Sequence, residues 1–528
     1  MRGLTRSFAP CAIFFAGILT TVTPTAGAAQ DAATDLSNVF DLGRLVADTN
    51  GDSVPDFVNG SLVLGANPSV AELSAAAEVS ARLGFETMAL DLPIARGASG
   101  QIPIVIGRGG LAESGISTPG IDPSSLDSGE GAVVAREIDG RTWLFVVGGD
   151  DDGLIAAARL FAGVLPHTRT LSTARLNKVT DDLSEALLAS GIDGATIRIT
   201  QARARAELDG ISRLIVEVDE VDAVAAEGAL KWLTTADGVT PDREGDDDPG
   251  NPTPETEAVE PSENEGTGDD AADDTDAASP PLSYPGLASV EVRLAGGASL
   301  RLPGRAAPDT PGPIAGRPSS GGKDDLDLSN MYTADGLLGG SPIPNTIDAM
   351  IVPGSSGTAG LPDLGARLGL ESTGLVVPLV QPAADVTRPS SQPTMVLVGV
   401  DNALTDQLAD TGRVDLAALQ PGEGLIELVP NAFGSKPALV ITGGDVAGAE
   451  RALDQVALTF PHLAERGKDR PTIDDVEQDL WDALSGHSPA GQAAIGLYKL
   501  DRILEQLSGE SIASASVLMS VEKADPGL

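Results

Sequence analysis

The sequence predicts an α/β protein made of tandem duplicated α/β domains with mixed sheets, each followed by a smaller α+β unit. Segments of the N-terminal third return in the same order in the C-terminal half, which indicates an internal duplication. Within each copy, apolar runs of strand length alternate with segments of helical periodicity. An acidic stretch rich in Pro, Gly and Ser lies between the copies, and its composition predicts a disordered insertion.

Residues 1–28 are typical of a secretory signal peptide. Arg2 and Arg6 precede an apolar run at 11–22, and the small residues "AGA" at 26–28 form the predicted cleavage site. Because that run is short for a membrane span, we expect an exported chain, periplasmic or extracellular, with no integral membrane segment after cleavage. Cleavage would also remove the single cysteine of the chain, and with it any disulfide or thiolate chemistry.

Two copies of the α/β domain are expected, at residues 35–167 and at 327–462. Their clearest matches are "DLSNVF" at 35–40 with "DLSNMY" at 327–332, "ARLGFETMALDLPIA" from Ala81 with "ARLGLESTGLVVPLV" from Ala366, and "VVGGDDDG" from Val146 with "ITGGDVAG" from Ile441. A collinear series of this kind rarely arises by chance, so we predict that the two domains share one fold.

The elements of the first copy follow in order. "SLVLG" predicts a strand, and the Ala-rich segment 68–84 predicts a helix that ends at Gly84. Two β-type runs come next, "MALDLPIA" and "IPIVIG". Residues 131–149 alternate around Asp139-Gly140, a pair suited to the tight turn of a β-hairpin. A helix with Asp at its N-terminus is then expected at 151–166.

A smaller α+β unit is expected at 168–305, with an incomplete equivalent at 463–528. The first of these units is interrupted by the segment 238–283, which we expect to be disordered. Residues 242–276 carry fifteen acids against one arginine, so this stretch cannot bury enough apolar surface to become ordered. A linker at 306–326 leads into the second copy.

The formal net charge of the chain is −43. A polyanion of this size repels the phosphates of nucleic acids and anionic lipid, so no nucleic acid partner is expected. Aromatic residues make up only 3% of the chain, so the cores must be built from Ala, Val, Leu and Ile.

The loop "DTNGDSVPD" at residues 48–56 places oxygen-bearing side chains at the spacing that offers ligands to Ca²⁺. It resembles the calcium loops of thrombospondin type-3 and dockerin-like repeats. The resemblance implies four side-chain ligands and one carbonyl: Asp48, Asn50, Asp52, Asp56 and the carbonyl of Val54. Ser53 stands where those loops usually have Gly, and a solvated Asp/Asn-rich turn is the alternative interpretation. The second copy has "GGSPIPN" here, without acids, so we expect a local clip on one copy and not an active centre.

No catalytic residues are assigned. Glu130 and Glu423 occupy matched positions in "GEG", and paired carboxylates serve glycosidases, but both are flanked by Gly and precede a strand, so we expect turn residues. The stretch "GRGG" at 107–110 follows a strand, where backbone amides could meet an anion. A tight turn is the simpler interpretation, because no nucleotide-binding pattern accompanies it. Neither His-Glu-x-x-His nor Gly-x-Ser-x-Gly occurs.

The stretch from Gly148 to Ala157, placed after a predicted hairpin, resembles the α/β accessory domains ahead of the catalytic barrel in α-glucuronidase-type glycosidases. It is also similar to the repeats of the periplasmic cellulose synthase regulatory subunit. These resemblances imply an exported, carbohydrate-related setting. We therefore predict an exported, non-catalytic scaffold or binding protein that contacts an extracytoplasmic polymer or protein partner, with Ca²⁺ as the only candidate cofactor. The alternative is the N-terminal accessory part of a larger exported hydrolase, with carbohydrate as its candidate substrate.

Overall fold

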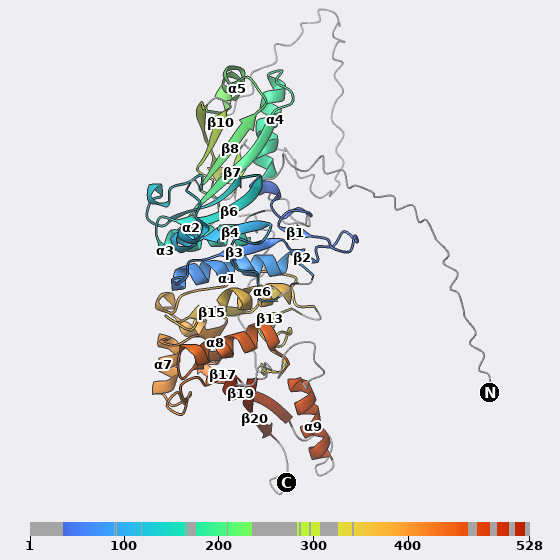
Figure 1. Cartoon of the computed structure of the whole chain (residues 1–528), viewed down its shortest axis with the longest axis vertical. Helices are drawn as coiled ribbons and strands as arrows, with labels where there is room; N and C mark the ends of the chain where they lie inside the picture. The colour runs from blue at the N-terminus through green and yellow to red at the C-terminus, as the bar shows by residue number, and fades with distance from the viewer. Residues whose placement is uncertain are drawn as a thin grey trace, which may run out of the picture.

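The computed structural model describes residues 35–163, 165, 176–234, 282–306, 326–462, 472–485, 494–505 and 513–522, apart from Ala89, Asp91, Thr118, 208–209, 285–286, 295–296 and 341–342. The predicted signal peptide, the acidic segment up to residue 281 and linker residues 307–325 lie outside the described residues. The described parts form an elongated body, with one sheet in each half and helices packed between the two sheets (Figure 1). The predicted mixed α/β class is confirmed.

The first half contains an eight-stranded mixed sheet in the order β11-β10-β8-β7-β5-β6-β4-β3. Its strands are β3 (Gly60–Val63), β4 (Ile102–Ile106), β5 (Glu130–Ile138), β6 (Arg141–Gly148), β7 (Thr196–Arg205), β8 (Arg213–Asp219), β10 (Ser289–Leu294) and β11 (Ser299–Pro303). β3, β4 and β6 are parallel, β5 and β7 pair antiparallel, and β10 lies parallel to β8. The β5–β7 pairing continues the sheet across the boundary predicted at residue 167, and that boundary stays a prediction.

The second half contains a six-stranded sheet in the order β15-β16-β18-β17-β19-β20. Its strands are β15 (Ala349–Pro353), β16 (Thr394–Val398), β17 (Gly424–Phe433), β18 (Lys436–Gly443), β19 (Ala494–Glu505) and β20 (Ala513–Glu522). Strand order and strand directions repeat those of β3-β4-β6-β5-β7-β8 in the first half. This shared topology is what an internal duplication predicts.

Helices and short elements complete the two halves. The α-helices are α1 (Val70–Phe85), α2 (Gly107–Ser114), α3 (Asp151–Gly163), α4 (Asn177–Ala189), α5 (Ala223–Leu230), α6 (Leu361–Leu370), α7 (Ala403–Asp410), α8 (Val446–Asp454) and α9 (Ile473–Ser485). The short helices are η1 (Leu36–Asn38), η2 (Pro123–Ser125), η3 (Lys231–Thr234), η4 (Ala383–Asp385), η5 (Pro389–Ser391) and the π-turn η6 (Gln455–Thr459). The short strands are β1 (Val46–Ala47), β2 (Phe57–Val58), β9 (Ser283–Tyr284), β12 (Arg305–Ala306), β13 (Leu338–Gly339) and β14 (Thr346–Ile347). Among the described helices, none is long and apolar enough to cross a bilayer.

Helix α1 lies in the middle of the molecule and is stabilised by its N-terminal cap and by burial. Ser69 and Glu72 form a reciprocal capping box at its N-terminus, and nearly all of its residues are buried. The predicted end at Gly84 is wrong by one residue, because Gly84 lies inside the helix against α6. The run "MALDLPIA" forms no strand among its described residues, and the backbone N–H of Ile94 is bonded to a side chain of the second half.

The hydrophobic cores of the two halves overlap at α1 and α6. Leu73, Ala77 and Ala81 of α1 belong to the core of the second half, whereas Ala366 of α6 belongs to that of the first. Smaller cores lie on the outer faces of the sheets, under α2 in the first half and α7 in the second. At the C-terminal edge of the predicted disordered segment, Leu282 is buried and Ser283 lies in β9, so these two residues are ordered, contrary to the prediction.

Candidate metal site and the junction between the halves

The predicted calcium loop connects β1 and β2, which pair antiparallel and hold its two ends together. Inside the loop, Asp48 accepts backbone N–H bonds from Asn50, Gly51 and Ser53, at 3.1, 2.6 and 2.7 Å. Ser53 has φ of +66°, a left-handed conformation that favours Gly, the residue usual at this position in the calcium loops that the sequence resembles. The chain therefore folds tightly around one carboxylate.

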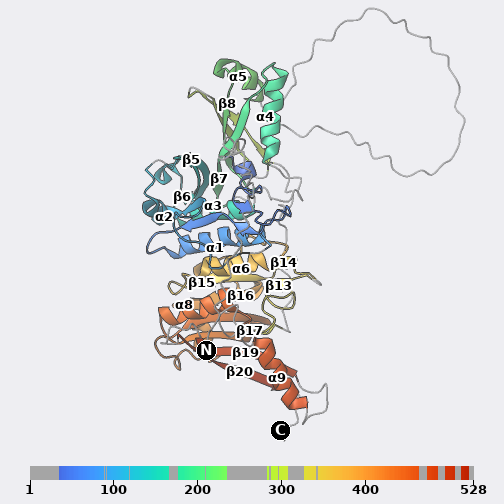
Figure 2. The same ribbon diagram turned by 45° about the vertical axis from the view of Figure 1, so that its right-hand side comes forward.

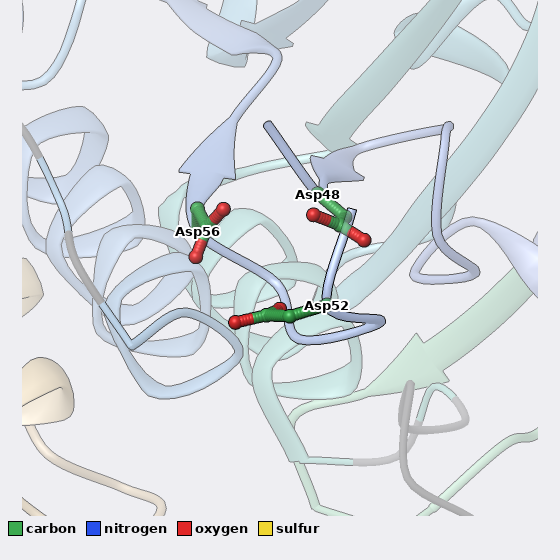
Figure 3. Close-up of side chains that lie close together, drawn as sticks. All are labelled: Asp48, Asp52 and Asp56. Carbon is green, nitrogen blue, oxygen red and sulfur yellow. The ribbon is translucent and has the colours of Figure 1, made fainter. Parts of the chain in front are cut away.

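Three carboxylates of this loop lie around one space (Figure 3). One oxygen from each of Asp48, Asp52 and Asp56 lies within 4.8 Å of the others. Backbone N–H donors, led by those of Gly51 and Ser53, lower the pKa of Asp48, so this carboxylate is ionised at neutral pH. Closely spaced anions repel each other unless a cation lies between them, and carboxylate oxygens are the ligands that Ca²⁺ prefers.

The second copy keeps the hairpin and lacks the acids. β13 and β14 pair antiparallel as β1 and β2 do. Gly339 ends β13 and Gly340 begins the equivalent loop, while Ser341 lies outside the described residues. The hairpin thus forms in both halves, although only one copy carries carboxylates.

The other sequence candidates take structural roles. Glu130 is buried, accepts the N–H of Asp127 and pairs with Arg203 at 3.3 Å, and Glu423 accepts the equivalent N–H of Gln420. Both glutamates therefore stabilise turns, as expected. The Gly-rich stretch at 107–110 begins α2, and there the N–H of Gly109 donates to the Glu72 carboxylate of α1 at 2.6 Å.

The two halves meet where α1 packs on α6 at backbone distance (Figures 1 and 2). A Cβ atom built on Gly84 would lie 2.0 Å from the carbonyl oxygen of Ala366, and one built on Gly369 would lie 2.0 Å from that of Ala81. The two contacts are equivalent by sequence repeat, so the helices are related by an approximate two-fold axis. Only glycine allows helix backbones to approach this closely.

Equivalent acids bind the opposite half on each side of this axis. Glu78 of α1 accepts the backbone N–H groups of Leu379 and Val380, both at 3.0 Å. Asp363 of α6 accepts the N–H of Ile94 at 2.8 Å. Burial raises the pKa of both carboxyls, and nearby arginines oppose that shift.

The arginines beside these two acids come from different elements. Arg159 of α3 lies 3.8 Å from the Glu78 carboxylate and donates to the carbonyl of Val380. Arg96 lies 2.8 Å from the Asp363 carboxylate, and the acid Asp454 lies nearby. Burial, followed by the charge of Asp363, raises the pKa of Asp454 to about 6.

Each half also contains a buried arginine at matched positions. Arg82 donates to Glu86 at 2.7 Å and to the carbonyls of Ala162 and Leu165, and its guanidinium lies 4.2 Å from the centre of the Phe40 ring. In the second half, Arg367 repeats this arrangement, with its guanidinium 4.4 Å from the Tyr332 ring centre. These arginines connect the central helices to the ends of α3 and η6.

Sequence reasoning did not assign roles to these junction residues. The signal was present in the repeated stretch "ARLG", where an arginine interrupts an apolar helix in both copies and a glutamate follows four residues later. A charged side chain is rarely buried unless it is paired. An arginine that recurs inside an apolar helix in both copies therefore indicates a buried partner for its side chain in each copy.

The chain matches a known protein family. The family model described as "S-layer like family, outer domain" matches residues 178–459, more than half of the chain. The match begins at α4 in the first half and ends at η6 in the second, so it includes α6 of the junction, whereas α1 precedes it. A search of curated proteins gives no significant match. The chain therefore belongs to the S-layer-like family, and the part that matches is the outer domain of that family.

Proposed function

We propose that this chain is a structural subunit of a cell-surface layer, a non-catalytic scaffold that contacts other protein or polymer components outside the cell. Membership of the S-layer-like family makes it an exported protein of the cell surface. The observation that carries the proposal is the junction of α1 and α6, where backbone-close packing and two buried acids join both halves. Such a junction resists bending, which suits a load-bearing element better than a hinged catalytic cleft.

The chemistry of the described residues supports the same proposal. The buried acids and arginines of the junction are bonded to backbone groups and to each other, so their polar atoms serve packing. The one group of three clustered carboxylates found among the described residues belongs to the exposed loop at Asp48.

We further propose that this loop binds Ca²⁺ and stiffens the hairpin between β1 and β2. The three gathered carboxylates support this role, together with the Asn50 side chain and the Val54 carbonyl implied by the loop pattern. A weak site suffices, because extracellular modules bind Ca²⁺ with dissociation constants of about 10⁻⁴–10⁻³ M.

Assembly of the mature chain tests the scaffold proposal. We expect ordered sheets or filaments in electron micrographs, and species larger than a monomer in analytical ultracentrifugation as the protein concentration rises. A chain that stays monomeric at high concentration, with and without Ca²⁺, contradicts the proposal. If the monomeric chain instead bound a polysaccharide, the alternative of an accessory part of a hydrolase would replace it.

Thermal unfolding tests the calcium proposal separately. At a tenfold excess of Ca²⁺ over its dissociation constant, binding stabilises the folded chain by about 1.4 kcal/mol, which raises Tm by roughly 3–5 °C. Asp52→Asn should remove this rise. Asp410→Asn, an exposed acid at the end of α7, should keep it. Equal Ca²⁺ responses in both variants would rule out the site, and Mg²⁺ should raise Tm less than Ca²⁺.

A further inference from the structure

The upper part of the first sheet has one face covered by helices and one face lined with arginines. Helices α4 and α5 pack on β7 and β10 (Figure 2). Val290, Val292 and Leu294 of β10 face the core with them, so Glu291 and Arg293 point to the opposite face. The same alternation in neighbouring strands places five arginines on that opposite face: Arg136, Arg203, Arg213, Arg293 and Arg301. We call this set the arginine face.

Register and ion pairs confirm that these side chains share one surface. Arg203 of β7 is the cross-strand partner of Arg213 in β8. Ion pairs within the face join Arg136 to Glu217 at 3.7 Å and Arg293 to Glu291 at 2.9 Å. Arg136 and Arg293 have side chains 39% exposed, so the face is open to solvent.

Positive charge on this face is only partly neutralised. Among the described residues, neither Arg213 nor Arg301 has a side-chain hydrogen bond or an ion pair, whereas Arg203 is paired with Glu130. The pKa of Arg213 is lowered by burial and then by the charges of Arg203 and Arg301, whereas Glu130 and Glu291 oppose that shift. An anion placed between these three arginines would oppose it further.

The chain itself supplies an anion next to this surface. Residues 235–281, which lie outside the described residues, follow η3, which packs on the edge strand β11 that carries Arg301. The described chain resumes at Leu282, whose N–H is bonded to Asp182 of α4. Between these anchors, residues 242–276 carry fifteen acids and one arginine.

The length of this stretch is sufficient for it to reach the arginine face. A coil of its length has an end-to-end distance of roughly 35–40 Å. Four strands span about 14 Å across a sheet. Because both anchors lie on the helix-covered side, the chain needs only to pass around β11. Tethering also gives the segment an effective concentration of about a millimolar at the face.

We propose that the acidic segment 242–276 docks on the arginine face of its own chain, with Arg213 and Arg301 as its main carboxylate-binding residues. The acids of the docked segment would supply carboxylates to Arg213 and Arg301, which have no ion pair among the described residues. Salt weakens the docking, because the contacts are solvent-exposed ion pairs.

Peptide binding to the full chain tests the proposal. In one variant, residues 242–276 are replaced by a Gly/Ser sequence of equal length, and the probe is a labelled peptide with the sequence of 242–276. We expect this variant to bind the peptide and the wild-type chain not to bind it. Adding Arg213→Gln and Arg301→Gln should weaken binding at least about fivefold, whereas Arg388→Gln, an exposed arginine of the second half, should not. Failure of the Gly/Ser variant to bind, or equal binding by both arginine variants, overturns the proposal.

A distance measurement within the intact chain gives an independent test. Nitroxide labels at Ser299→Cys in β11 and Thr267→Cys in the segment should give a short distance distribution at low salt and a broader, longer one at 1 M NaCl. The double substitution of Arg213 and Arg301 should give the long distribution at low salt as well. A distribution that neither salt nor the substitutions change would show that the segment lies elsewhere.

Discussion

Substitution of Gly369 by alanine should force α6 away from α1. The added Cβ would lie 2.0 Å from the carbonyl oxygen of Ala81 and 3.0 Å from the backbone nitrogen of Phe85. Ordinary carbon–oxygen contacts are about 3.4 Å or longer, so the helices must separate by roughly 1 Å. Both obstacles are backbone atoms of a buried helix, and neither can rotate aside as a side chain would.

The magnitude follows from two opposing contributions. Alanine is favoured over glycine inside a helix by about 1 kcal/mol. Overpacking of a close-packed contact costs about 1–3 kcal/mol, and a backbone obstacle places this site at the upper end of that range. We therefore expect Gly369→Ala to lower the free energy of unfolding by about 2 kcal/mol, equivalent to a fall in Tm of roughly 4–8 °C.

Urea denaturation followed by circular dichroism measures this change, and Gly228→Ala is the matched control. Gly228 lies in helix α5, is exposed, and would have no atom within 4 Å of an added Cβ. Its replacement should stabilise the chain by about 0.5–1 kcal/mol. If Gly369→Ala stabilised the chain as the control does, the close contact between α1 and α6 would be refuted.

Two further predictions concern the buried charges. Arg82→Met should cost about 3–5 kcal/mol, because it strands the buried carboxylate of Glu86. Arg367→Met should cost less, about 1–3 kcal/mol, since its partner Glu371 is 33% exposed. Equal losses of unfolding free energy in the two variants, measured by denaturant titration, would contradict the role of burial. For Asp454, the folded-state pKa of about 6 lies above the ordinary 3.8, so its stabilising contribution is present at low pH and is lost as the pH rises through 6. The free energy of unfolding of Asp454→Asn should therefore rise relative to that of the wild type between pH 4 and 7. The rise should be less than about 1 kcal/mol, because the Asp454 side chain is exposed. A difference in unfolding free energy between the two proteins that does not change over this pH range would refute the assignment.

Local signals in the sequence predicted much of the first sheet. The pair Asp139-Gly140 has φ of +54° and +72°, as the tight hairpin turn requires, and it connects β5 to β6 as expected. Asp150 accepts the N–H of Gly153 at the start of α3, which is the expected helix cap. In these cases all the interacting groups lie within a few residues, so the sequence alone contains the information.

Features that depend on the junction were not predictable in the same way. The pattern of "MALDLPIA" predicts a strand, but the N–H of Ile94 is bonded to Asp363, 269 residues away. Gly84 predicts a helix terminus, because glycine often ends helices. Its actual reason is the carbonyl of Ala366 across the junction. Local pattern cannot distinguish these alternatives, because the partner that decides between them belongs to the other copy.

The calcium loop lies between these two cases. Its five implied ligand residues lie at every second position from 48 to 56, and the structure gathers the carboxylates of Asp48, Asp52 and Asp56 as the spacing suggested. The left-handed conformation of Ser53 matches the position at which related loops have Gly. Ion binding itself depends on the balance between ligand attraction and carboxylate hydration, which neither spacing nor geometry determines, so it stays a prediction.

The two copies differ in the charges that they place at the junction. Arg159 of α3 corresponds by sequence repeat to Asp454 of α8, and Arg96 corresponds to Gln381. The acids of the central helices are retained in both copies, as Glu78 in the first and Asp363 in the second. The first half therefore supplies the arginine beside each acid, and the second half supplies none.

This difference in charge favours contact between a first half and a second half over contact between two like halves. Suppose that the first halves of two chains met through their α1 helices. Arg96 and Arg159 of both chains, four arginines in all, would then lie beside only two glutamates, the Glu78 of each chain. If two second halves met, four aspartates would gather without a single arginine from these positions. Either arrangement gathers like charges around the buried acids or arginines of the junction without enough opposite charge, which disfavours it, although solvent reduces the cost because Arg96, Arg159 and Asp454 are partly exposed or exposed. An internal two-fold that began as identical copies would allow pairing between like halves of different chains, whereas the diverged charges disfavour it and direct each first half to a second half.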